Sequence, residues 1–166
     1  MSPENVSHVS DSAGRQTALD PGSAVAMAIC CLAIIGALVL GVGLPGNLVL
    51  RHLVQTAPLW AGVVLGFRHS RATAWVGLPL FLFWLLLMGL IWSYLLGISS
   101  LISGHFSSLE IAMTIIVGAA SLIGIASFIR FKSSLSPLNA SGLFALAAVI
   151  QVICFRLSFL PAIAHR

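Results

Sequence analysis

The chain has 166 residues, of which 59% are hydrophobic and only 7% are charged, and its mean hydropathy is +1.08. A soluble domain carries about 25% charged residues, so this composition excludes an ordinary soluble protein and predicts an all-α integral membrane protein. The net charge of +4 comes from basic residues that stand singly between apolar segments. A nucleic-acid-binding protein would gather them on one face instead.

Residues 1–22 are polar, rich in serine and without hydrophobic periodicity, which predicts a disordered tail. Three of the four acidic residues of the chain, Glu4, Asp11 and Asp20, lie in this segment beside a single Arg15. A signal peptide starts with a short positive region, so this long, net negative start predicts that the next apolar segment stays in place as a membrane anchor. Residues 23–166 are predicted to form one helical transmembrane domain.

The first two of five apolar segments are joined by a very short turn. Residues 23–44 hold no charged residue, and their length fits the roughly 20 residues that a helix needs to cross a bilayer. The run GVGLPGN, residues 41–47, ends that segment. Residues 47–67 form the least apolar segment because they contain Arg51, His52, Gln55 and Pro58.

Three further segments complete a predicted bundle of five transmembrane helices. Residues 74–98 are the most apolar, and residues 109–129 follow the run SSLE, which predicts a capping box between Ser107 and Glu110. Residues 138–163 form the last segment and carry Gln151 and Arg156 in its second half.

The basic residues predict the orientation of this bundle. Arg68 and Arg71 lie in the link after the second segment, and Arg130 and Lys132 lie in the link after the fourth, so both links should be cytoplasmic. With five spans, the N-terminus is then cytoplasmic and the C-terminus outside, in a multi-pass protein of the cell (inner) membrane. If residues 47–67 do not span, four spans remain and the N-terminus moves outside.

Four polar residues are candidates for a ligand-binding site on the outer side of the bundle. Arg51, His52 and Gln55 lie early in the second segment, and Arg156 lies late in the fifth, at a similar predicted depth. An ionisable residue within a span is a functional candidate. The alternative is that each arginine extends along the hydrocarbon to the lipid phosphates and has no further role.

The sequence lacks the residues that most catalytic and metal sites need. Glu110 is the one acid after residue 20, so paired carboxylates and a Ser-His-Asp triad have no candidates there. His69 falls at the inner face of the membrane, whereas His52 and His105 fall near the outer face. The three cysteines lie in apolar runs without metal-ligand spacing. The sequence therefore predicts no metal, no cofactor and no enzyme.

Two pairs of small residues allow helix backbones to approach each other closely. Gly62 and Gly66 form one pair, and Ala120 and Gly124 form the other. The sequence favours contacts within the chain, but self-association or contact with another membrane subunit is the alternative.

Three functions are consistent with these features of the sequence. The first is a non-enzymatic multi-pass membrane protein that is a small subunit or accessory component of a larger membrane assembly. The second is an oligomeric transporter or channel for an anionic or uncharged small solute. The third is a membrane-embedded enzyme acting on a lipid head group, in which Arg51 and Arg156 hold the phosphate and His52 is the base.

Overall fold

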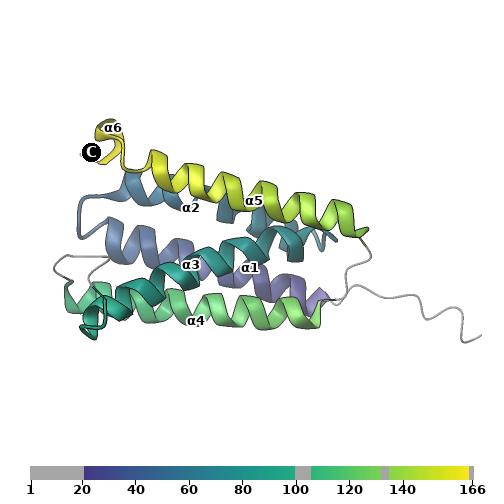
Figure 1. Ribbon diagram of the computed structural model, residues 1–166, viewed down its shortest axis with the longest axis horizontal. Coiled ribbons are helices and arrows are strands. Elements are labelled where there is room, and N and C mark those ends of the chain that lie inside the picture. Colours follow the sequence, from purple (N-terminus) through teal and green to yellow (C-terminus); the bar gives the residue numbers. More distant parts are fainter. Residues whose placement is uncertain (1–20, 100–105, 132–134, 165–166) are drawn as a thin grey trace, which may run out of the picture.

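A computed structural model describes residues 21–99, 106–131 and 135–164 of the chain. Within these ranges the secondary structure is helical, without strands, and the long helices run side by side along the longest axis of the molecule (Figure 1). In chain order the elements are α1 (Pro21–Gly36), the π-helix η2 (Ala37–Gly43), α2 (Val49–Phe67), α3 (Thr73–Leu95), α4 (Ser108–Arg130), α5 (Pro137–Leu157) and α6 (Pro161–Ala164).

Four helices in the described part of the chain are long and apolar enough to cross a membrane. They are Gly22–Gly43, which joins α1 to η2, and the helices α3, α4 and α5. These four agree with the predicted segments 23–44, 74–98, 109–129 and 138–163. The predicted segment 47–67 corresponds to α2, a helix of 19 residues that is not among the four. The fifth span therefore stays a prediction.

Two predicted segments are shorter in the structure, and both end at a recognisable signal. Helix α3 ends at Leu95, where Gly97 adopts a φ of 72° and the Ile98 N–H donates to the carbonyl of Ser93. This arrangement is a Schellman cap, which needs the left-handed conformation that glycine adopts without strain. Helix α5 ends at Leu157 because Pro161 cannot continue it: its ring would clash with the carbonyl four residues earlier.

The start of α1 agrees with the predicted first segment. Helix α1 begins at Pro21, two residues before the predicted start. Proline is favoured at the first helical position because the N–H that it lacks would have no partner there. Apart from Pro21 and Gly22, the predicted tail of residues 1–22 lies outside the described residues.

Helices α1 and α2 approach each other closely through the first small-residue pair. A Cβ atom at Gly66 would stand 2.7 Å from the carbonyl oxygen of Ala24 and 2.7 Å from the Cβ of Ala28. A Cβ atom at Gly62 would stand 2.8 Å from Sγ of Cys31. In the structure this pair therefore lies in a contact within the chain, as the sequence favoured.

The second small-residue pair lies between α3 and α4. A Cβ atom at Gly124 would stand 2.6 Å from the ring of Phe81, which is fully buried, and Ala120 is buried beside it. Self-association through either small-residue pair would require these contacts within the chain to open.

The turn after η2 brings the start of α2 back against the helix that precedes it. Asn47 takes a φ of 53°, a conformation that asparagine tolerates better than most residues. The N–H of Leu48 donates to the carbonyl of Gly43 at 2.8 Å, which closes the turn. This places Arg51 and His52 at the end of the bundle where η2 finishes.

Candidate functional site

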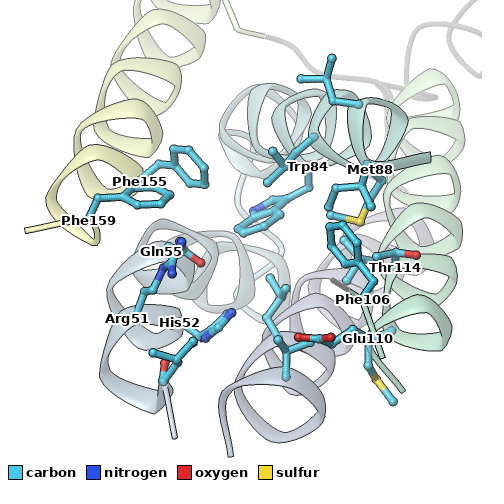
Figure 2. A pocket seen from close by; sticks show the side chains of 18 residues that line it. Arg51, His52, Gln55, Trp84, Met88, Phe106, Glu110, Thr114, Phe155 and Phe159 are labelled. Carbon is cyan, nitrogen blue, oxygen red and sulfur yellow. Dashed lines mark hydrogen bonds between the residues drawn. The ribbon is translucent and has the colours of Figure 1, made fainter. Parts of the chain in front are cut away.

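A cavity of about 670 Å³ lies at the end of the bundle where α2 and α4 begin and α3 and α5 end. Figure 2 shows Arg51, His52 and Gln55 on one side of it and Phe106, Glu110 and Thr114 on the other. Its volume falls within the roughly 300–1,000 Å³ typical of small-molecule pockets. The other lining residues are apolar. They come from η2, α3, α4 and α5, and from the positions just before α2 and just after α5: Leu38, Val42, Leu48, Trp84, Leu87, Met88, Leu90, Ile91, Met113, Val117, Phe155 and Phe159.

Arg51 is the third residue of α2 and faces an aromatic ring. Its guanidinium carbon is 4.3 Å from the centroid of the Phe159 ring, a cation–π contact. Its Nε atom is buried and has no hydrogen-bond partner among the described residues. A buried donor without an acceptor is costly, so this atom can gain an interaction when an acceptor enters the cavity.

His52 is held in one orientation by the backbone. Its Nδ1 lies 2.9 Å from the carbonyl oxygen of Leu48. Because a carbonyl can only accept, Nδ1 must carry a hydrogen and donate it. The neutral imidazole then has its lone pair on Nε2, so Nε2 is the atom that can meet a ligand. The side chain is 8% exposed.

Gln55 joins α2 to the end of α5. Its Nε2 donates to the hydroxyl of Ser158 at 3.0 Å, and its backbone carbonyl accepts from Nε2 of Gln151 at 3.1 Å. All three side chains are buried. The sequence did not predict the contribution of Gln151, although polar residues at matched depth on two apolar helices are the signal that would have suggested it.

Arg156 stands apart from the other three candidates. It is exposed and does not line the cavity. The predicted segment 138–163 placed it well inside a span, whereas α5 ends one residue later, at Leu157. The structure therefore brings Arg51, His52 and Gln55 together and leaves Arg156 at a helix end.

Glu110 supplies the negative charge of the cavity and caps α4. The N–H and hydroxyl of Ser107 both donate to Oε2 of Glu110, at 2.7 and 2.9 Å, and the Glu110 N–H donates to the Ser107 hydroxyl at 3.3 Å. The predicted capping box is thus confirmed. Glu110 also lines the cavity opposite α2 and is near enough to His52 for an electrostatic interaction.

Aromatic side chains form much of the remaining wall, and the sequence did not single them out. The rings of Phe155 and Phe159 are 5.1 Å apart in an edge-on arrangement, and Phe83 packs against Phe155 at 5.2 Å. Trp84 lines the inner part of the cavity (Figure 2). The sequence did not identify these residues because, in an apolar chain with nine phenylalanines, no single aromatic position stands out.

Within the described residues, no group of three or more His, Cys, Asp or Glu side chains is placed to hold a metal ion. His52 lies near the start of α2 and His69 just beyond its end, so those two histidines are at opposite ends of that helix. The cavity instead combines a cation, an imidazole, an amide and a carboxylate with apolar walls.

No protein-family model, no curated protein and no solved structure matches the chain.

Proposed function

We propose that the chain is a non-enzymatic multi-pass membrane protein of the cell membrane, an accessory component of a larger membrane assembly that holds a small ligand at one end of a five-span bundle. Four apolar helices support the membrane location. The proposal adds α2 as the fifth span and puts the cavity at the outer end, where the positive-inside rule directs it.

The exposed face of α2 supports the fifth span. Its large exposed side chains are all apolar and recur at helical spacing: Leu50, Leu53, Trp60, Val64 and Phe67. The polar residues His52 and Gln55 are buried on the opposite side. A hydropathy average over the whole helix combines both faces, but lipid would contact only the apolar one.

The observation that carries the proposal is that buried side chains pack the bundle directly beyond the cavity. One turn beyond the lining residues Gln55 and Trp84, the side chains of Leu59, Leu80 and Phe81 are fully buried. Packing of this kind argues against a continuous path along the bundle. A cavity backed by packed side chains suits binding better than conduction.

The transporter remains the second candidate because two deformable elements flank the cavity. The π-helix η2 contributes Leu38 and Val42 to the wall, and α2 contains Pro58 one turn past Gln55. π-Helical segments and proline kinks are frequent where helices rearrange. A second conformation that opens the packed inner end would turn the cavity into a vestibule.

The lipid-modifying enzyme receives less support. It requires Arg51 and Arg156 to hold one phosphate together, and Arg156 lies outside the cavity lining.

Purification of the full chain from its native membrane in mild detergent tests the proposal, followed by native mass spectrometry and by flux measurements in liposomes. We expect at least one other membrane protein in a fixed stoichiometric ratio, and no flux of chloride or glycerol from liposomes containing the chain alone. A homo-oligomer without partners that conducts either solute would contradict the accessory role and establish the transporter instead.

A further inference from the structure

We propose that the cavity binds a lipid whose head group carries both a phosphate and an ammonium group, as an ethanolamine phospholipid does. The phosphate lies at Arg51 and His52, the ammonium group lies at Glu110, and one acyl chain follows the apolar wall. This inference rests on the proposed function, which places the cavity at the membrane surface.

The α2 side of the cavity is built to meet an anion. Arg51 has a buried Nε donor without a partner among the described residues, and the Phe159 ring covers its guanidinium group. A guanidinium group held in this way offers parallel N–H donors that match a phosphate. The ring also orders the long side chain before the ligand arrives, which reduces the entropy that binding would cost.

His52 extends this anion-binding side. It follows Arg51 directly on α2, and its Nδ1 bond to Leu48 fixes the ring against the backbone. The remaining nitrogen, Nε2, donates a hydrogen bond to the phosphate when the ring is charged, and when the ring is neutral it can accept one from the ammonium group of the ligand. Each protonation state of His52 therefore meets one of the two charged groups of such a head group.

The α4 side carries the opposite charge. Both hydrogen bonds from Ser107 fall on Oε2 of Glu110, and they hold the carboxylate without neutralising it. A ligand with only negative charge would place that charge across the cavity from Glu110, which is unfavourable in a site of low dielectric. A ligand that carries an ammonium group next to its phosphate satisfies both walls.

The apolar part of the cavity accommodates a hydrocarbon chain. Leu87, Met88 and Ile91 of α3 face the cavity, as do Met113 and Val117 of α4. Methionine side chains adapt to ligands of irregular shape. Because the cavity lies where the helices of the bundle begin and end, lipids are the amphipathic molecules that meet it at the right depth.

Charge substitutions on the two walls separate this lipid from others. Arg51→Gln removes the cation. Glu110→Gln removes the anion but keeps the cap, because glutamine also completes a capping box. Arg156→Gln is the matched control, since it removes an arginine that does not line the cavity. Each full-length protein is titrated, by native mass spectrometry in mild detergent, with lysophosphatidylethanolamine and with lysophosphatidylglycerol.

The unaltered protein should bind the ethanolamine lipid about tenfold more tightly than the glycerol lipid, the factor expected for one charge-assisted contact. Arg51→Gln should weaken the binding of both lipids about tenfold. Glu110→Gln should weaken the binding of the ethanolamine lipid alone, so that the preference for it over the glycerol lipid disappears. Arg156→Gln should change neither affinity.

Equal affinity of the unaltered protein for both lipids would overturn the inference, and so would an absence of binding. An effect of Arg156→Gln as large as that of Arg51→Gln would also overturn it, by showing contact with head groups outside the cavity. If Arg51→Gln fails to fold, as judged by circular dichroism, the preference of the unaltered protein and its loss in Glu110→Gln decide the matter. None of these results alters the co-purification and flux results, so this inference can fail while the proposed function stands.

Discussion

Replacing Phe81 by alanine should lower the free energy of unfolding in mild detergent by about 3 kcal/mol. The ring is fully buried in α3 and rests against Gly124 of α4. This loss of stability is at the low end of the range for a buried phenylalanine. The free energy of transfer from water is largely missing, because lipid or detergent and not water surrounds the helices when they separate. What remains is the loss of dispersion contacts and the cavity left behind.

Leu86→Ala is the matched control for this change. Leu86 lies on the same helix but is 65% exposed, so its loss should alter the stability by less than about 0.5 kcal/mol. The midpoints of thermal and dodecyl sulfate unfolding measure both variants. If the two substitutions cost the same, the α3–α4 packing described above is wrong.

Replacing Gly66 by alanine should destabilise the protein by about 2 kcal/mol, the typical cost of overpacking. The new Cβ would lie 2.7 Å from the carbonyl oxygen of Ala24, which is backbone and cannot rotate away. Helices α1 and α2 would therefore have to separate along the contact that also includes Gly62. The start of α2, with Arg51, lies at the opposite end of that helix.

Gly118→Ala is the control because a Cβ atom there meets nothing within 4 Å. Alanine is the better helix former by up to about 1 kcal/mol, so this variant should be as stable as the unaltered protein or more so. The same unfolding midpoints measure both changes. A Gly66→Ala variant as stable as Gly118→Ala would mean that α1 and α2 are not in close contact.

Much of the helical architecture could be predicted from the sequence. Four apolar segments reappear as long helices, and the run SSLE marks the start of α4 through the capping box of Ser107 and Glu110. The ends of α3 and α5 were placed too late because hydropathy continues past them. Gly97 and Pro161 mark both ends, and backbone geometry at these residues outweighs apolar composition.

The candidate site was only partly predictable, because the sequence does not show which side chains of the packed helices face the cavity. Polarity alone identified Arg51, His52 and Gln55, and all three line the cavity. Arg156 is an arginine like Arg51, but it lies at a helix end and outside the cavity lining. Its position depends on where α5 ends, which polarity alone does not show.

The opposite wall shows the limit of sequence patterns. Glu110 was interpreted as a cap, and its second position, facing α2 across the cavity, depends on how α2 and α4 sit in the bundle. No spacing along the chain encodes that arrangement.

A five-span bundle with the cavity on the outer side requires the two chain ends to lie on opposite sides of the membrane. Reporter proteins that are active on one side of the membrane only are fused to the N-terminus and the C-terminus, with a further pair inserted at Ser70 and Ser99 as internal references. We expect the N-terminus and Ser70 to lie inside, and Ser99 and the C-terminus to lie outside. Both termini on the same side of the membrane would contradict it, because α2 would then not cross.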